Sequence, residues 1–156
     1  MINRFIRSLL GAALLFIALS CNRGEVYYKF SPIPKNEWSK HHEVTFLIDS
    51  SSNIADKNYR LSLELVHNIS YQYKNLFLLI DHTLQDSILW QDTVECVLVD
   101  GAGRWQGSGN GATRQLSVPF STTFRIDTAL HNEINIRHAM QDLQLKGIEK
   151  IGLRIY

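Results

Sequence analysis

The feature that most constrains the fold of this chain is a two-residue alternation of apolar and polar side chains in short segments. It is clearest in residues 59–67, which read YRLSLELVH. Successive side chains of a strand point to opposite faces of a sheet, so this pattern predicts a strand with one buried face. The residues predicted to face the core are Tyr59, Leu61, Leu63 and Leu65, and those predicted to face solvent are Arg60, Ser62 and Glu64.

Similar short segments recur along most of the chain, with turn signals between them. The other predicted strands are residues 26–30, 43–49, 76–80, 88–90, 94–99, 116–118, 124–126, 133–138 and 151–156. Residues 76–80 are apolar on both faces, which predicts a central strand covered on each side. Residues 139–146 are the one predicted helical turn, with Gly147 as its C-cap. About eight or nine short strands predict an all-β, single antiparallel β-sandwich, either jelly-roll or immunoglobulin-like, with the strand order left open.

Residues 92–111 contain the strongest local signal for an unusual loop. The alternation of residues 94–99 ends at Asp100, and residues 101–111 contain five glycines, with Trp105 among them. Glycine adopts backbone conformations with positive φ that other residues resist. The stretch therefore predicts a shaped loop that is held in place by a tryptophan.

The N-terminal residues have the layout of a secretory leader. Arg4 and Arg7 precede an apolar run of 11 residues, Leu9–Leu19, which is shorter than the roughly 20 residues that span a bilayer. The leader ends in Ala-Leu-Ser-Cys, which resembles the lipobox of bacterial lipoproteins and predicts that Cys21 is lipidated. Cleavage by an ordinary signal peptidase near Cys21 is the rival. The predicted organisation is a lipoprotein signal peptide over 1–20, a lipidated tether with a possible edge strand over 21–30, and a β-sandwich domain over 31–156.

The composition beyond the leader argues against several classes of partner. The leader holds two of the 16 Lys and Arg and no acid, so the remaining 136 residues carry 14 basic and 15 acidic side chains. This balance offers no basic field for nucleic acid and no polybasic patch for anionic lipid. If Cys21 is acylated, Cys96 has no partner for a disulfide, and its place in an alternating strand predicts a buried, unreactive thiol.

Candidate catalytic and metal-binding patterns are weak. His41 and His42 are adjacent, so in a strand their side chains point to opposite faces and do not converge on one metal ion. Asp81 and His82 could assist a serine nucleophile, but the sequence contains no nucleophile elbow of the GxSxG type. Gly101-Ala102-Gly103 follows a predicted strand, but the third glycine and the helix of a dinucleotide-binding fingerprint are missing. We therefore expect no catalytic residue, no metal and no cofactor. The alternative function is that of a carbohydrate-binding envelope lipoprotein. In that case a sugar ring would stack on an exposed Trp105.

Taken together, the motifs resemble the GldH family of gliding-motility lipoproteins of Bacteroidota, over essentially the whole chain. The residues that carry the resemblance are Trp38 before 44–46, then Tyr71 with 75–78, Asp92-Thr93 with Leu98, Asp100-Gly101 with Arg104-Trp105, Gly107 and Gly109, residues 137–140, Gly147-Ile148 and residues 151–154.

The resemblance implies a membrane-anchored envelope lipoprotein that works beside other gliding or type IX secretion proteins. It implies protein–protein interaction without catalysis, a lipid anchor at Cys21, and no nucleic-acid or small-molecule ligand. Asn22-Arg23 lacks an acidic run of the kind associated with surface export, which favours a periplasm-facing domain. The expected membrane is the outer membrane. Since binding often uses shaped loops on rigid scaffolds, the loop with Trp105, Gly107 and Gly109 is the predicted partner-binding loop.

Overall fold

A computed structural model describes residues 25–48, 57–85, 87–127 and 130–156. These residues form β-strands and one short 3-10 helix, and the strand pairings among them are antiparallel. In chain order the elements are β1 (Tyr27–Pro32), η1 (Pro34–Asn36), β2 (Glu37–Ser39), β3 (Val44–Ile48), β4 (Tyr59–Asn68), β5 (Asn75–Leu84), β6 (Ser87–Val97), β7 (Thr113–Phe124), β8 (Asn132–His138), β9 (Gln144–Lys146) and β10 (Ile148–Ile155). The predicted all-β class is confirmed.

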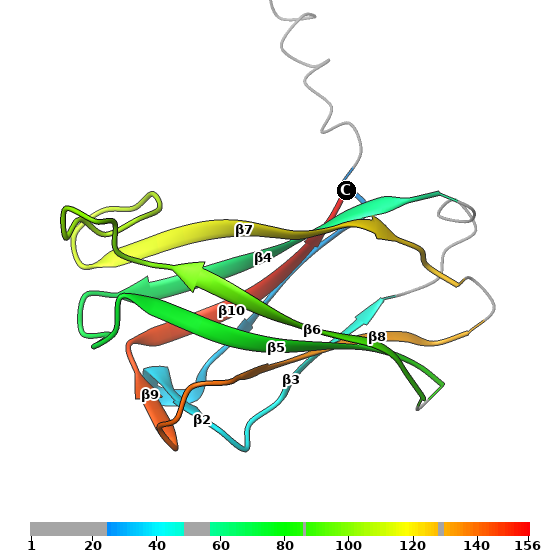
Figure 1. Ribbon diagram of the computed structural model, residues 1–156, viewed down its shortest axis with the longest axis horizontal. Coiled ribbons are helices and arrows are strands. Elements are labelled where there is room, and N and C mark those ends of the chain that lie inside the picture. The colour runs from blue at the N-terminus through cyan, green and yellow to red at the C-terminus, as the bar shows by residue number, and fades with distance from the viewer. Residues whose placement is uncertain (1–24, 49–56, 86, 128–129) are drawn as a thin grey trace, which may run out of the picture.

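Two four-stranded sheets wrap around one core, as a sandwich (Figure 1). The first sheet has the order β1-β10-β4-β7 and the second has the order β3-β8-β5-β6. The short pair β2-β9 lies beside them. Strands that are neighbours in space are mostly distant in sequence, so the alternation within single segments could not predict this order.

The core consists of the apolar side chains on the facing sides of the two sheets. The side chains that are at most 1% exposed on the long strands include Phe46, Leu61, Leu63, Leu65, Leu76, Leu78, Ile80, Ile134, Ile136, Ile151, Leu153 and Ile155. Full burial of each such side chain stabilises the fold by about 1.5–3 kcal/mol. Their two-residue spacing is the alternation seen in the sequence, which is why the strands were predictable.

The prediction that Ser62 and Glu64 face solvent is wrong, although the alternation of β4 is correct. Both side chains point away from the core but are at most 3% exposed. Gly152 stands opposite Glu64 in the sheet, and a Cβ on this glycine would lie 2.7 Å from the Phe30 ring and 2.9 Å from the Cβ of Glu64. The missing side chain therefore admits the ring beside Glu64. The Ser117 hydroxyl donates to Oε1 of Glu64 at 2.8 Å, so the buried carboxylate is hydrogen-bonded.

Two pairs of predicted short segments belong to longer strands. Residues 88–90 and 94–97 form the single strand β6, and Leu98 and Val99 of the predicted segment 94–99 lie beyond its end. Residues 116–118 and Phe124 belong to β7, which contains Pro119. Proline lacks a backbone N–H, but β7 is the edge of its sheet, and the pairing of β7 with β4 is irregular near this proline. Because an edge strand tolerates a proline, the residues on both sides of Pro119 form one strand.

The predicted helical turn over residues 139–146 is wrong. Residues 144–146 form β9, which pairs with β2 and buries Leu145. Such a short segment does not stabilise a helix by itself, so pairing with another strand decides its conformation. Gly147 has φ +88°, and a Cβ there would lie 2.6 Å from the backbone nitrogen of Tyr71. The glycine is required by this close approach rather than by a helix cap.

The strands run between two opposite ends of the sandwich. At the end that we call proximal, the described chain begins, and Val26 N–H donates to the Ile155 carbonyl at 2.9 Å. Tyr59 pairs with Phe124 at this end, whereas Asn68 pairs with Thr113 at the other, distal end. The ten residues of β4 separate the two ends by about 30 Å. The described residues include no helix that is long and apolar enough to cross a membrane.

Candidate partner-binding surface

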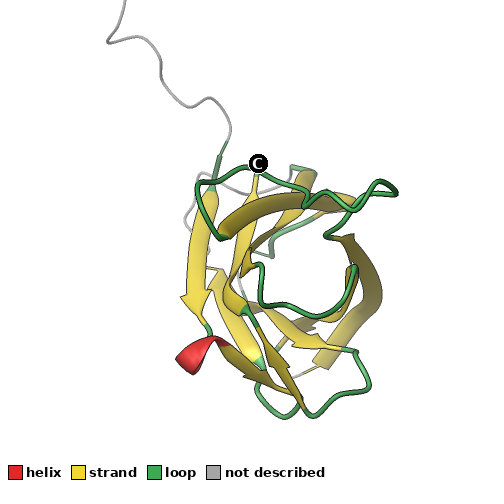
Figure 2. Ribbon diagram, turned by 90° about the vertical axis from the view of Figure 1, so that its left-hand side faces the viewer, coloured by secondary structure: helices red, strands yellow, loops and turns green. Residues whose placement is uncertain are grey.

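Three connections meet at the distal end and form what we call the distal loop cluster: residues 69–74, 98–112 and 139–143. Ile69 N–H donates to the Ala112 carbonyl at 3.0 Å, which joins the first connection to the second. The Tyr73 hydroxyl donates to Asp142, which joins the first to the third. Figure 2 looks onto this end of the sandwich, with its loops toward the viewer. The cluster thus brings together segments that are distant in sequence.

Apolar side chains are exposed on two of these contacting loops. Leu143 is 65% exposed, Ile69 is 55% exposed and Tyr73 is 37% exposed. Single exposed apolar side chains are normal on protein surfaces, but several on adjoining loops form the kind of surface that partners bind. Sequence patterns did not predict this exposed apolar group, because residues 69–74 and 139–143 lack alternation and come together through the fold.

A small pocket lies between the first and third loops. Its volume is about 110 Å³, and its lining is Tyr71, Gln72, Tyr73, Asp142, Gln144, Leu145 and Lys146. The rings of Tyr71 and Tyr73 lie 5.7 Å apart in an edge-to-face arrangement. The pocket therefore offers aromatic surface beside amide, carboxylate and ammonium groups.

Asp100 organises the first turn of the glycine-rich loop. Its Oδ1 accepts hydrogen bonds from the backbone N–H groups of Ala102 and Arg104, both at 2.9 Å, and its Oδ2 accepts one from Nε of Arg104. The hydrogen bond from the Arg104 backbone is the largest of the influences that lower the pKa of the Asp100 carboxyl. The carboxylate thus holds the turn in a fixed shape, as the sequence predicted for this stretch.

Gly107 and Gly109 place the second half of this loop directly against β7. Their φ angles are +90° and +151°. A Cβ on Gly107 would lie 2.3 Å from the Gln115 carbonyl oxygen, and one on Gly109 would lie 2.3 Å from the Thr113 carbonyl oxygen. No side chain fits at either position without movement of the backbone. These two glycines shape the loop and offer no side chain to a partner.

Trp105 anchors the loop to the body of the sandwich. The residue is half-buried, packs against the core, and forms an isolated bridge with Val99. Its ring lies 5.1 Å from the ring of the buried His67 on β4. A tryptophan in this position is a poor platform for a stacked sugar ring, because much of its surface is already in contact with the protein.

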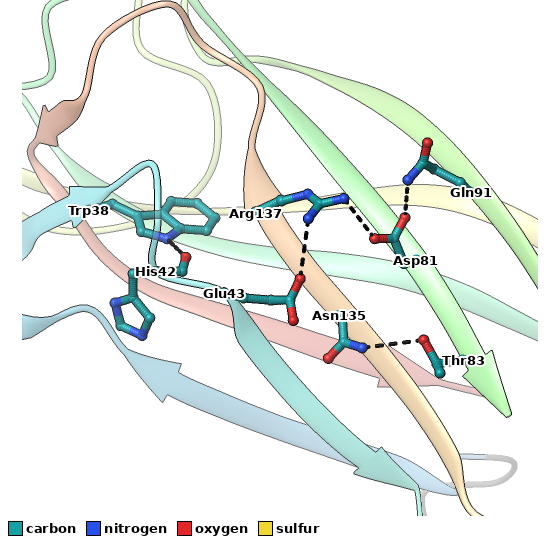
Figure 3. A network of polar contacts seen from close by, with 8 residues as sticks. All are labelled: Trp38, His42, Glu43, Asp81, Thr83, Gln91, Asn135 and Arg137. Atoms are coloured by element: carbon teal, nitrogen blue, oxygen red, sulfur yellow. Dashed lines mark hydrogen bonds and ion pairs between the residues drawn. The ribbon is translucent and has the colours of Figure 1, made fainter. Parts of the chain in front are cut away.

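His41 and His42 lie in a turn before β3 and not in a strand. The indole N–H of the buried Trp38 donates to the His42 backbone carbonyl at 2.9 Å, as Figure 3 shows. His41 lines a shallow polar hollow with Lys40, Glu43 and Arg137. Within the described ranges, no three His, Cys, Asp or Glu side chains are grouped so that they could hold a metal ion.

A polar network on the outer face of the second sheet centres on Asp81, which is 4% exposed (Figure 3). Its Oδ1 accepts a hydrogen bond from Gln91 at 2.6 Å, and its Oδ2 accepts one from Arg137 at 3.0 Å. Arg137 also lies 3.6 Å from the exposed carboxylate of Glu43. Asp81 and His82 are neighbours on β5, so their side chains point to opposite faces of the sheet. The His82 ring contacts the Phe124 ring on the core side. The network holds β5, β6 and β8 together.

Three histidines and one cysteine are titratable groups that the fold buries. His67, His82 and His138 are at most 4% exposed, and burial lowers the pKa of each imidazole. Cys96 is fully buried, and burial raises the pKa of its thiol to about 12. The prediction of a buried Cys96 is confirmed. Cys21, the predicted lipidation site, lies outside the described residues.

The family model and the relatives that match this chain all carry the name of one lipoprotein family. The family model described as GldH lipoprotein matches residues 25–155. The chain is 27% identical over 143 residues to the gliding motility lipoprotein GldH homolog of Christiangramia forsetii, covering 87% of this chain and 86% of that protein. It is 26% identical over 157 residues to the gliding motility lipoprotein GldH of Flavobacterium johnsoniae, covering 94% and 92%.

Among solved structures, the dimeric latent PorU of Porphyromonas gingivalis matches with a TM-score of 0.31 and 10% identity, over 87% of this chain and 13% of that one. This likeness is too low to support an argument about fold or function. The family match covers nearly all of the sandwich, from before β1 to the end of β10. The chain therefore belongs to the GldH lipoprotein family.

Proposed function

We propose that this protein is an envelope lipoprotein of the gliding machinery that acts by binding other proteins through its distal loop cluster, and not by catalysis. The observation that carries the proposal is the group of exposed apolar side chains, Ile69, Tyr73 and Leu143, on loops tied together by hydrogen bonds. The two relatives are both named as gliding motility lipoproteins, which supports a role of this protein in the gliding machinery. Gliding or type IX secretion proteins of the envelope are the proposed partners.

The short distance along the chain between Cys21 and β1 predicts how the domain is oriented relative to the membrane. Lipidation at Cys21 places the anchor five residues before Val26, and five extended residues span at most about 18 Å. The proximal end then lies near the membrane, and the distal loop cluster lies about 30 Å farther away. We place the anchor in the outer membrane with the domain facing the periplasm. In this position the distal loops reach partners that are not themselves at the bilayer surface.

Crosslinking and pull-down of the tagged full-length protein from native membranes test this proposal. Leu143→Asp should reduce recovery of envelope partners, because it introduces a charge into the apolar surface. Leu47→Asp is the matched control, since Leu47 is 61% exposed but lies at the proximal end, on β3. Cys21→Ala should also reduce recovery, because the domain leaves the membrane. Equal recovery with Leu143→Asp and Leu47→Asp, at unchanged thermal stability, would rule out the distal loops.

The pocket beside Tyr73 favours carbohydrate binding as a second candidate function. Sugars are bound by aromatic rings together with amide and carboxylate groups, and Tyr73, Gln72, Asp142 and Gln144 bring these groups to one pocket. A glycan array with the purified domain distinguishes the two candidates. Binding that is lost in Tyr73→Ala would support the sugar-binding function and would remove the reason to seek protein partners at this end.

A further inference from the structure

The free edge of β6 differs from the other sheet edges of the sandwich. β6 pairs with β5 and forms the outer strand of its sheet. From Trp90 to Val97 it stays in unbroken register with β5. It contains no proline and no lysine, the residues that commonly protect an edge strand from further pairing. Along this stretch the Thr93 N–H donates to Oδ1 of the adjacent Asp92 at 2.8 Å. The backbone groups of Gln91, Glu95 and Val97 that point away from β5 have no backbone partner among the described residues, so they can pair with another strand.

The other sheet edges carry such protection. β1 contains Lys29 and ends at Pro32, and β7 contains Pro119 near a register irregularity. β3 has five residues, and it lies next to β1, where the Tyr27 ring contacts the Phe46 ring at 6.5 Å. β6 is thus a long edge without proline or lysine, whose only charged side chains, Asp92 and Glu95, are acidic.

The side of the sandwich next to β6 is also incompletely closed. β6 and β7 are the outer strands of different sheets and do not pair in the described residues. The Trp90 and Phe120 rings meet across this side at 6.4 Å. Leu116 and Val118 on β7 are half-buried there, although they pack against the core. A strand added to β6 would place its inward-facing side chains against this apolar surface.

The charges on β6 indicate what kind of strand would fit. Asp92 and Glu95 are exposed, and β6 contains no basic residue. A second copy of β6 would bring two more carboxylates and no positive charge, whereas opposite charges on neighbouring strands stabilise their pairing. We propose that the β6 edge binds an extended segment of a partner protein, with basic and apolar side chains, as an added strand. This site lies on the side of the sandwich and is independent of the distal loop cluster.

Hydrogen exchange of the full-length protein in detergent tests the inference. The probes are two short peptides of alternating valine and threonine, one with two lysines and one with two glutamates. We expect the lysine peptide to slow exchange in residues 90–97 and to bind about tenfold more tightly than the glutamate peptide. Slowed exchange at β3 or β7 in place of β6, or no slowing with either peptide, would overturn the proposal.

A charge reversal provides the decisive control. The double variant Asp92→Lys, Glu95→Lys should reverse the order of affinity, so that the glutamate peptide binds more tightly. Glu43→Lys, directly before β3 and away from β6, should leave the order unchanged. Leu143→Asp should also leave it unchanged, which separates this site from the distal loops. If residues 90–97 become protected on raising the protein concentration without peptide, while the protein dimerises, self-association through β6 replaces the proposal.

Discussion

The rings of Trp105 and His67 lie 5.1 Å apart at an interplanar angle of 45°, and this contact joins the glycine-rich loop to β4. The same kind of contact recurs for the other two tryptophans, in the pairs Trp38–His138 at 5.5 Å and Trp90–His82 at 5.8 Å. Each tryptophan of the chain therefore packs against a buried histidine. Stability, pH dependence and the shape of the distal end all depend on these contacts.

Replacing Trp105 by alanine should destabilise the fold. Full truncation of a buried tryptophan costs about 3–5 kcal/mol, and Trp105 is half-buried, so we expect a loss of about 2 kcal/mol. Trp105→Phe keeps an aromatic ring against His67 and should lose less. Urea unfolding followed by circular dichroism measures both. An unchanged unfolding midpoint in Trp105→Ala would show that the ring serves a partner and not the fold.

Gly107→Ala should destabilise the protein by about 1–3 kcal/mol, because the added methyl group meets the Gln115 carbonyl and the backbone has a positive φ. Gly101→Ala is the control. A Cβ on Gly101 has no heavy atom within 4 Å, so its effect should stay within about 0.5 kcal/mol. Thermal melts of the two variants compare them directly. Equal melting temperatures would contradict the described position of the loop on β7.

Stability should decrease as the pH falls below about 6.5. Burial lowers the folded-state pKa of His67, His82 and His138 below the ordinary value of 6.5, so the unfolded chain binds more protons below that pH. Each histidine contributes a slope of up to about 1.4 kcal/mol per pH unit, which levels off below its folded-state pKa.

Urea midpoints between pH 7.5 and 5 measure this slope. His138→Phe removes one buried titrating group and should flatten the slope, whatever its effect on stability at neutral pH. His41→Gln changes an exposed histidine and should leave the slope as it is. A wild-type stability that is constant over this range would contradict the burial of the three imidazoles.

Asp81→Ala should destabilise the fold by about 1–3 kcal/mol, because it leaves Gln91 and Arg137 without the buried carboxylate that accepts their hydrogen bonds. Glu43→Gln removes the exposed partner of Arg137 and should cost less than about 1 kcal/mol. Equilibrium unfolding in urea distinguishes the two. A larger loss from the Glu43 variant would show that the outer pair, and not Asp81, holds the network together.

The Cys96 thiol should resist modification in the folded protein. It is fully buried and its pKa is raised to about 12, so the reactive thiolate is scarce at neutral pH. In a Cys21→Ala variant, a thiol reagent such as DTNB should react slowly under native conditions and rapidly in denaturant. Native labelling at the denatured rate would place Cys96 at the surface.

The sequence predicted those features that depend on one strand at a time. The inward positions of β4 and β10 followed from alternation, because a buried face selects apolar residues at every second position. The glycine-rich loop was also predictable, since its unusual backbone requires residues without a side chain. Cys96 was placed correctly for the same reason as its strand neighbours.

The features that the sequence did not predict depend on contacts between distant segments. Glu64 is buried because Gly152 and Phe30, from other strands, meet on the outer face of its sheet. Residues 144–146 form a strand because β2 is available to pair with them. The exposed surface of Ile69 and Leu143 exists because two unrelated loops adjoin. No local pattern contains this information.

The adjacency of β1 and β10 has a mechanical consequence. Suppose that the lipid anchor holds the chain before β1 while a moving partner pulls on the distal loops. Tension then runs along the strands, and β1 is drawn lengthwise against β10. Their six paired residues are bonded perpendicular to that direction, so all the hydrogen bonds between them resist together and do not open one after another. A domain tethered in this way transmits traction in shear, the geometry in which a pair of strands is hardest to separate.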